Sequence, residues 1–585
     1  MGPIGSEDNN DRNQLSVMND EFDAIVIGSG MSGGWAAKEL CEKGLKVLVL
    51  ERGRELSVEK DYSDMLSPWE RPNLDRIPED ELKKHYPMQS KSVGWVVHET
   101  TKQFWVKEDE QPYETPQDAP FEWVRGYHSG GKSLMWGRHS YRFGPQDFEA
   151  NKKDGHGVDW PIRYDDLAPW YDHVERFAGI SGDRDGIPSL PDGVFQPAFE
   201  LTMPEKAFAE RVNKAFPTRR VIAARVAHLT APTQEQMDLG RGPCQVRDHC
   251  HRGCSFGAYF SSVSATLPAA RNTGNMTLIS HAIVHSIDYD PVSKRASGVR
   301  VIDANTREAK TYSARLIFLN ASTVASTLIM LNSRSQTFPN GLANSSGQLG
   351  HNLMDHFGGA WAGGEMPGFD DYYYAGRRPG GIYIPNFANV TEHDKPFLRG
   401  YGFQGASSRP GWTGNRPGIG QDFKQANRAP GSWSIGIGAF GDMLPNYRNH
   451  IRLHETKTDK WGMPVAIIDC RMGENELKLM QAAAKDARDM LTAGGCVNVR
   501  ASDVTMESLT APGNKIHEMG TARMGRDPKT SVLNGWCQSH NVPNLFITDG
   551  SCMASSAVQN PSLTYMALTA RAANHATELL KTGVL

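Results

Sequence analysis

Three closely spaced cysteines carry the most specific chemical signal in the sequence. Cys244, Cys250 and Cys254 lie in the stretch CQVRDHCHRGC, and His249 and His251 flank the middle cysteine. A disulfide cannot use all three thiols, and a loop this short gains little from closure. Three thiolates with an imidazole could bind zinc, although C-x5-C-x3-C is not the spacing of a zinc ribbon. Three thiolates could also hold a three-iron cluster, so the residues alone leave both metals open.

A second stretch has the glycine spacing of a dinucleotide-binding turn. Gly28, Gly30 and Gly33 follow one apolar run, and Glu51 ends the next, 18 residues after the last glycine. In this context Gly28 permits a tight turn, Gly30 lets the backbone approach a pyrophosphate, and Gly33 lets helix and strand pack closely. Glu51 can accept hydrogen bonds from ribose hydroxyls. The pattern predicts a dinucleotide site and does not distinguish NAD from FAD.

Two C-terminal segments place polar side chains in glycine-rich surroundings. One contains His517, and the other runs from Asp549 and Gly550 to Asn560, before a helical run to Leu580. A neutral imidazole can accept a proton near pH 7, whereas a carboxamide can hold a hydroxyl oxygen without titrating. Taken alone, a histidine before a glycine-rich loop, such as His517, is more often a structural residue.

The elements that must position these residues belong to a large globular protein. The length of 585 residues predicts two domains. The composition, with 39% hydrophobic and 22% charged residues, is typical of a globular protein. We expect strands at 24–27 and 46–50 with a helix between them. A net charge of −4 argues against nucleic acid as a partner. Residues 1–17 are polar and acidic, so we expect a disordered tail and no signal peptide there.

Three further features follow from composition. Glycine, proline, tyrosine and arginine are frequent between Gly358 and Gly431, which favours an irregular cover over a site. No apolar run is long enough to cross a bilayer. Five scattered cysteines are predicted to be buried structural thiols: Cys41, Cys470, Cys496, Cys537 and Cys552.

These motifs, in this order, resemble the glucose–methanol–choline (GMC) oxidoreductases, a family of FAD-dependent alcohol oxidases and dehydrogenases. The resemblance extends from Phe22 to the C-terminus and includes GGKSLMW at 130–136, GHNLMDH at 350–356 and DKWGMP at 459–464. It implies an α/β fold with a Rossmann-like FAD-binding domain and a substrate domain built on an antiparallel sheet. The expected FAD-binding domain comprises residues 18–155, 235–357 and 510–585, and the expected substrate domain comprises 156–234 and 358–509.

The resemblance also implies roles for individual residues. His517 matches the catalytic base, and Asn560, 43 residues later, matches its partner in the sugar-oxidising branch. Met135 stands where pyranose oxidases have a histidine that bonds to the flavin, so we expect FAD to bind without a covalent link. The expected cofactor contacts are Gly28, Gly30, Gly33, Glu51, Gly131, Ser133, Trp136, Val284, Asp549, Gly550 and Asn560.

For the three cysteines the resemblance favours a [3Fe-4S] cluster over zinc. Some bacterial FAD sugar dehydrogenases of this family carry that cluster on cysteines at this spacing. Electrons would then leave through Cys244, Cys250 and Cys254 to a cytochrome c or a quinone. Related enzymes pair with a small subunit that carries a twin-arginine signal, so we expect such a partner and a periplasmic location, with the cytoplasm as the alternative.

The substrate expectation rests on the same branch. Its glucoside 3-dehydrogenases oxidise the C3 hydroxyl of a pyranose or glycoside to a keto sugar, and the chain resembles their catalytic subunit. Oxidation at C1 of glucose, or a pyranose oxidase reaction with oxygen, is the alternative.

Overall fold

A parallel β-sheet joins the N-terminal and C-terminal parts of the chain. The computed structural model describes residues 22–371, 376–409, 418–428 and 430–585, so the predicted tail at 1–17 lies outside the described residues. The sheet has five strands in the order β17-β9-β1-β2-β5, and all neighbouring pairs are parallel. The strands are β1 (Phe22–Ile27), β2 (Val47–Leu50), β5 (Met276–Ile279), β9 (Ala314–Leu319) and β17 (Leu545–Ile547).

Short apolar runs explain why the central strands are buried. The last four residues of β1 and all four residues of β2 are buried, which is typical of a parallel strand covered on both faces. The strands predicted at 24–27 and 46–50 are therefore confirmed, with small differences at their ends.

Helices cover this sheet and bring the two ends of the chain together. α1 (Met31–Glu42) follows β1 and packs against α9 (Thr266–Asn272) and α13 (Ser562–Lys581). α13 also packs against α6 (Tyr164–Ala178). The predicted C-terminal helical run to Leu580 is confirmed, and it lies beside the helix that follows the glycine motif.

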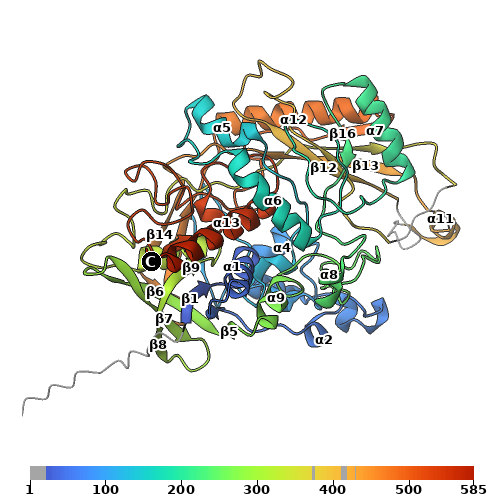
Figure 1. Ribbon diagram of the computed structural model, residues 1–585. Coiled ribbons are helices and arrows are strands. Elements are labelled where there is room, and N and C mark those ends of the chain that lie inside the picture. Colours follow the sequence, from blue (N-terminus) through green and yellow to red (C-terminus); the bar gives the residue numbers. More distant parts are fainter. Residues whose placement is uncertain (1–21, 372–375, 410–417, 429) are drawn as a thin grey trace, which may run out of the picture.

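A six-stranded antiparallel sheet lies in the upper right part of the molecule in Figure 1, below α12 and α7. Its order is β16-β10-β13-β12-β11-β4, and α12 (Glu474–Ala493) contacts β10, β13 and β16. Burial alternates along β13, as expected for a strand with only one face in the core. The strands are β4 (Ile222–Ala223), β10 (Trp361–Glu365), β11 (Ile382–Ile384), β12 (Tyr401–Ser408), β13 (Ser434–Gly441) and β16 (Val497–Ala501).

The prediction of an irregular cover between Gly358 and Gly431 is wrong for much of that segment. β10, β11 and β12 all belong to it, and β12 lies near the middle of the antiparallel sheet. A Cβ on Gly405 would lie 2.3 Å from the carbonyl oxygen of Gly436 on the next strand. Glycine here permits close strand approach, which composition cannot distinguish from a turn. The tyrosines at 372–374 lie outside the described residues.

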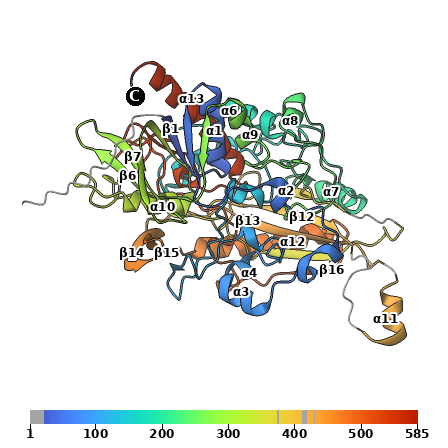
Figure 2. The same ribbon diagram turned by 90° about the horizontal axis from the view of Figure 1, so that it is seen from below.

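Two three-stranded sheets complete the strand content of the described residues. In β6-β7-β8 all pairs are antiparallel, whereas β14-β15-β3 is mixed. Figure 2 separates the β6–β7 sheet, near β1 and α1, from α12 and β16. The strands are β3 (Tyr113–Glu114), β6 (Ala282–Asp290), β7 (Arg295–Asp303), β8 (Ala309–Tyr312), β14 (His450–Thr458) and β15 (Pro464–Asp469).

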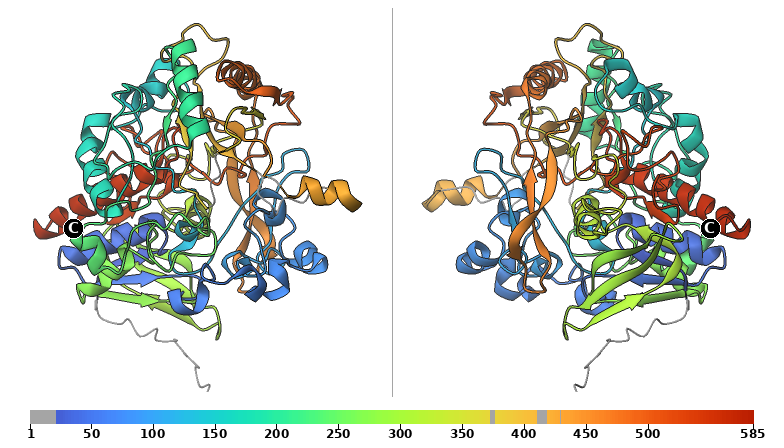
Figure 3. Two further views of the ribbon diagram at one scale, coloured as in Figure 1. Left: turned by 90° about the vertical axis from the view of Figure 1, so that its right-hand side faces the viewer. Right: turned by 90° about the vertical axis from the view of Figure 1, so that its left-hand side faces the viewer.

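The arrangement confirms the predicted α/β class, with a Rossmann-like parallel sheet and a separate antiparallel sheet. The boundaries of the two domains stay a prediction. Among helices of the described residues, none is long and apolar enough to cross a bilayer. Figure 3 shows α11 projecting from the body. The other α-helices are α2 (Val58–Asp61), α3 (Glu79–His85), α4 (Gln89–Ser92), α5 (Pro145–Asp154), α7 (Met203–Ala215), α8 (Gln234–Asp238), α10 (Thr323–Asn332) and α11 (Gly420–Ala426).

Candidate active site

A large cavity opens at the carboxyl ends of the parallel strands. Its lining includes Ile27 and Leu50, which end β1 and β2, and it reaches residues of β14 and β15. Ligands of open α/β sheets bind at this edge. The predicted residues that line this cavity are Gly28, Gly30, Glu51, Gly131, Ser133, Trp136, Val284, His517, Asp549, Gly550 and Asn560.

The three glycines of the dinucleotide motif have different surroundings. Gly28 has φ +91°, and a Cβ on it would lie 2.5 Å from the backbone oxygen of Asn320. A Cβ on Gly33 would lie only 1.9 Å from the carbonyl oxygen of Gly28, and Gly33 is absent from the cavity lining. Gly30 is open, because the nearest atom to its Cβ would be the Gly130 oxygen at 3.9 Å. Gly30 therefore leaves space for an anion at the start of α1, whereas Gly33 serves packing.

Two buried carboxylates lie beside this space. Glu51 accepts hydrogen bonds from the Ser29 hydroxyl at 2.5 Å and from the Gly53 backbone N–H at 2.9 Å. Asp549 accepts one from the Ser326 hydroxyl at 2.5 Å. Burial raises the pKa of both carboxyls. Both can accept hydrogen bonds from the hydroxyls of a bound dinucleotide.

His517 and Asn560 meet at the cavity wall. His517 Nε2 and Asn560 Nδ2 are 3.3 Å apart. Gln404, in β12, donates from its Nε2 to Asn560 Oδ1 at 2.6 Å, so the Asn560 amide nitrogen is the atom that faces His517. The predicted pair therefore presents a nitrogen that can accept a proton beside one that can donate a hydrogen bond. This is the arrangement needed to hold a hydroxyl group.

The backbone before His517 is strained and tightly held. Ile516 has φ +62°, in the left-handed region that a β-branched residue rarely adopts. The Asp355 carboxylate accepts three backbone N–H bonds around it, from Gly513 at 2.7 Å, Lys515 at 3.2 Å and His517 at 2.8 Å. Burial raises the pKa of Asp355 to about 7, with a further contribution from a neighbouring carboxylate. These hydrogen bonds fix the loop that carries the histidine.

The ring of His517 has a second imidazole as its neighbour. His356 Nδ1 lies 2.8 Å from His517 Nδ1. Burial lowers the pKa of both histidines, and that of His517 falls well below 6.5. Both rings are therefore neutral near pH 7, which is the state a proton acceptor requires.

Positive charges near the ring reinforce this effect. Lys132 and Lys515 line the cavity and both disfavour the protonated form of His517. Lys132 is paired with Glu518 at 2.9 Å. The Lys515 ammonium lies 5.2 Å from the ring centroid of Phe440, and burial lowers the pKa of this lysine.

Arg138 connects the segment with the three cysteines to the cavity. Arg138 lines the cavity and donates from Nη2 to the Cys250 carbonyl oxygen at 2.9 Å. Cys250 Sγ lies 3.7 Å from His228 Nε2. Burial, with smaller contributions from Cys250 and Cys254, raises the pKa of Cys244 to about 11, so the three thiols share one neighbourhood.

The thiols do not form a ready metal site. Within the part of the chain that the structure describes, no group of three or more His, Cys, Asp and Glu side chains is placed to hold a metal ion. The five scattered cysteines are buried, as predicted: Cys41, Cys470, Cys496, Cys537 and Cys552.

The cavity has the features that FAD needs. Besides the open Gly30 and the carboxylate of Glu51, two buried polar atoms on its wall, Asn320 Nδ2 and the Tyr565 hydroxyl, have no partner. Unpaired buried polar atoms are costly unless a ligand satisfies them. Gly131 faces Gly30 closely, since its Cβ would lie 3.4 Å from the Gly30 Cα. The residues present therefore fit a bound dinucleotide.

A dinucleotide cavity that ends at a neutral imidazole and a carboxamide has the groups that the oxidation of an alcohol requires. The GMC oxidoreductase family matches residues 22–358 and 445–569, and the chain belongs to this family. The protein is thus an FAD-dependent oxidoreductase that acts on CH–OH donors. The predicted family is confirmed.

Two curated relatives and one solved structure illustrate the similarity. The fructose dehydrogenase large subunit of Gluconobacter japonicus is 25% identical, over 96% of this chain and 98% of its own. The 2-methyl-1,2-propanediol dehydrogenase of Mycolicibacterium austroafricanum is 28% identical, over 96% of each chain. A formate oxidase structure from Aspergillus oryzae RIB40 has a TM-score of 0.62 at 13% identity, over 96% of this chain and 99% of its own, and shows the shared fold.

Sequence reasoning missed several residues of the site. In the sequence, Asp355 and His356 are marked only as the end of the GHNLMDH motif. Gln404 lies in the glycine-rich segment whose composition predicts an irregular cover. Lys515 is two residues before His517, and this proximity was the one local sign of its position.

Two glycine variants should separate packing from cofactor binding. Gly33→Ala places its Cβ against backbone atoms of Gly28, so it should lower the free energy of unfolding by about 1–3 kcal/mol. Gly30→Ala meets no protein atom closer than 3.9 Å, so the flavin-stripped protein should unfold normally but bind FAD weakly. Thermal unfolding and fluorescence titration with FAD measure the two effects. Equal stability losses in both variants, or normal FAD affinity in Gly30→Ala, would contradict this division.

Proposed function

We propose that the protein is a sugar dehydrogenase that oxidises a secondary hydroxyl of a pyranose or glycoside, at C3, to a keto sugar. The observation that carries the proposal is the position of His517 Nε2, 3.3 Å from Asn560 Nδ2 at the wall of the dinucleotide cavity. FAD, when bound, supplies the acceptor for the hydride that leaves the carbon. We propose that it is held without a covalent bond, because Met135 offers no nucleophilic nitrogen.

The two side chains divide the work on the substrate hydroxyl. Neutral His517 accepts the hydroxyl proton at Nε2, which an alcohol needs because it is a very weak acid. Asn560 donates a hydrogen bond from Nδ2 to the hydroxyl oxygen and thereby orients the carbon that loses hydride. Gln404 keeps that amide in the required orientation through its bond to Oδ1.

The choice of a sugar rests on similarity and on the character of the cavity. A relative that spans nearly the whole chain is described as a fructose dehydrogenase. Trp95 and Trp136 line the cavity and offer flat apolar surfaces, which suit the apolar face of a pyranose ring. Oxidation at C3 follows the resemblance to glucoside 3-dehydrogenases, and oxidation of glucose at C1 or reaction with oxygen is the competing proposal.

Methyl β-glucoside should separate these proposals, because its C1 hydroxyl is blocked. We expect it to reduce the flavin and to yield a C3 ketone, identified by NMR of the product. Glucose serves as the control substrate. If methyl β-glucoside is inert while glucose gives a lactone, the enzyme oxidises C1. Peroxide that accumulates with sugar and air would indicate an oxidase.

The acid limb of activity should report His517. Burial, reinforced by His356, Lys132, Lys515 and His139, lowers its pKa well below 6.5. Activity requires the neutral ring and is lost as the pH falls through this lowered pKa, so kcat/KM should stay level down to pH 6.5 and decline only below it.

His517→Ala should keep FAD but reduce flavin about 10²–10⁴-fold more slowly in stopped flow. An acid limb centred above pH 6.5, or wild-type reduction by the variant, would refute the assignment.

We also propose that Cys244, Cys250 and Cys254 hold a [3Fe-4S] cluster through which electrons leave to a cytochrome c or quinone. The support is their spacing and their shared neighbourhood. Burial raises the pKa of Cys250, and the nearby guanidinium groups of Arg138 and Arg378 partly oppose this effect. The three thiols would have to move closer to one another to bind such a cluster. No step of the reaction above depends on it.

Cys250→Ser tests the electron exit. Metal analysis of the wild type should find about three iron atoms for each chain, as a three-iron cluster requires. The variant should lose iron and cytochrome-linked turnover, yet its flavin should still be reduced by sugar. Cys470→Ser, which removes a buried thiol elsewhere, is the matched control and should keep its iron. One zinc and no iron in the wild type would exclude the cluster.

A partner and a compartment complete the proposal. We propose a small subunit with a twin-arginine signal and a periplasmic location, with the cytoplasm as the alternative. The support is the proposed cytochrome acceptor and a relative that is described as a large subunit. A cofactor-loaded protein must fold before export, which makes shared export of the folded pair physically reasonable. Fractionation of native cells and co-purification would test both points.

A further inference from the structure

We propose that His356 is a positioning residue that fixes the ring tautomer of His517, so that the bare Nε2 of His517 faces the substrate. This inference rests on the proposed function, because it assigns the proton positions that make His517 a base. It follows from the contacts of the two rings, taken one nitrogen at a time.

The first step concerns His356 Nε2. It lies 3.2 Å from the Ser556 carbonyl oxygen and 2.9 Å from the Ala557 carbonyl oxygen. Carbonyl oxygens only accept hydrogen bonds, so Nε2 must carry a hydrogen. Burial lowers the pKa of His356, so the ring is neutral and its Nδ1 carries none.

The second step transfers this choice to His517. The two Nδ1 atoms are 2.8 Å apart, and since His356 Nδ1 is bare, His517 Nδ1 must donate. A neutral ring with hydrogen on Nδ1 has a lone pair on Nε2. Asn560 Nδ2, a donor, lies 3.3 Å from that Nε2, which agrees with this assignment. The opposite tautomer would leave two lone pairs facing each other between the Nδ1 atoms and two donors facing each other between Nε2 and the Asn560 amide. It would also leave no acceptor for the substrate proton.

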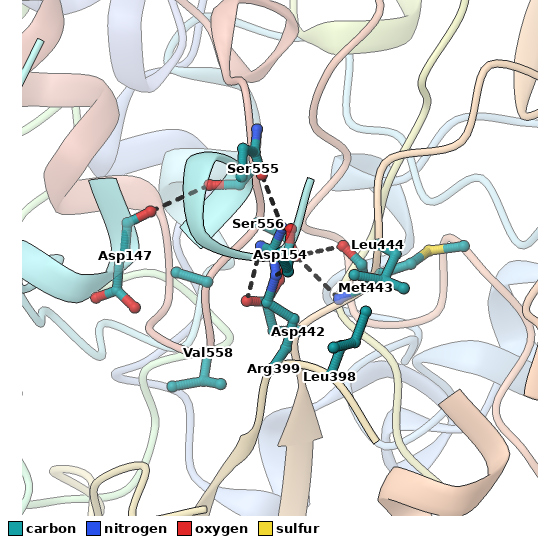
Figure 4. Close-up of polar contacts among 12 residues, drawn as sticks. Asp147, Asp154, Leu398, Arg399, Asp442, Met443, Leu444, Ser555, Ser556 and Val558 are labelled. Carbon is teal, nitrogen blue, oxygen red and sulfur yellow. Dashed lines mark hydrogen bonds and ion pairs between the residues drawn. The ribbon is translucent and has the colours of Figure 1, made fainter. Parts of the chain in front are cut away.

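The Ser556 side chain, next to the carbonyl groups that contact His356, takes part in the polar contacts shown in Figure 4. The Ser556 hydroxyl donates to Asp442 Oδ1 at 2.5 Å and accepts from the Met443 backbone N–H at 3.0 Å. Arg399 pairs with Asp442 at 3.4 Å. Ala557 has φ +54°, an unfavourable conformation for a residue with a Cβ. This network maintains the backbone that presents two acceptors to one ring nitrogen.

Nitrogen NMR of ring-labelled histidine tests the assignment without any substrate. The two ring nitrogens give separate signals for N–H and lone-pair states, and His517→Ala identifies the signals of His517. We expect Nδ1 protonated and Nε2 bare in the wild type at pH 7. Protonated Nε2 would overturn the proposal. Because no sugar is present, this result is independent of whether the proposed substrate is correct.

Variants of His356 test the consequence for the reaction. His356→Leu removes the contact with His517 and the contacts with the two carbonyl oxygens. It should slow flavin reduction by sugar about 10–100-fold, because His517 would then present a bare Nε2 to the substrate only part of the time. His356→Gln can donate to the carbonyls and accept from His517, so it should recover most of the rate. In a His517→Ala background, His356→Leu should change the residual rate less than about twofold, because the two residues act as a unit.

FAD content and the unfolding midpoint of each variant control for loss of structure. A loss that persists in the His517→Ala background would show that His356 supports the fold and not the tautomer. Failure of His356→Gln to recover while it keeps FAD would also contradict the proposal. If His356→Leu does not fold, the NMR result and His356→Gln still decide the question.

Discussion

Two adjacent residues, Asp355 and His356, impose the constraint on which the site depends. Asp355 holds the backbone of the 513–517 loop through three N–H bonds, and His356 contacts the ring at the end of that loop. Ile516 adopts a left-handed backbone conformation, which costs about 1–3 kcal/mol for a residue of this kind. Such strain persists only where neighbours determine the conformation more strongly than the residue itself. The ring position of His517 is therefore a property of the surrounding fold.

The parts of the molecule built on the parallel sheet and on the antiparallel sheet must pack together, because each contributes residues that position the His517–Asn560 pair. Asn560 lies two residues before the start of α13, whose first residue, Ser562, lines the cavity. α13 packs on α1, the helix that follows the glycine turn. Gln404 comes from the antiparallel sheet and sets the orientation of the Asn560 amide. Across from Gln404, Gly438 has no side chain, and a Cβ there would meet nothing within 4 Å. The antiparallel sheet thus contributes a direct contact to Asn560 and, on the neighbouring strand, a position with no side chain.

The sequence predicted what depends on local pattern. The glycine turn, both central strands and Glu51 are adjacent in the chain, so their spacing alone indicates their structure. The strands around Gly405 were missed because glycine, placed there for close strand approach, has the composition of a turn. His356 and Gln404 were missed for another reason: each acts on a residue 161 or 156 positions away, and no local pattern reports such contacts. The His517–Asn560 pair was found through the resemblance, not through periodicity.

Burial and charge together determine when His517 can take a proton. Burial in the cavity lowers the pKa of His517 well below 6.5, and Lys132 and Lys515 lower it further. The ring therefore holds a proton weakly when no negative charge lies beside it. Negative charge that arrives beside the ring has the opposite effect, because an anion within a few ångströms favours the protonated form. Under the proposed function, the alkoxide that forms as the hydroxyl proton leaves would be such an anion, and it would lie beside Nε2 and the Asn560 amide. The surroundings that keep the free ring neutral would then let it hold the proton while that oxygen is negatively charged, and a bound FAD would supply the acceptor for the hydride.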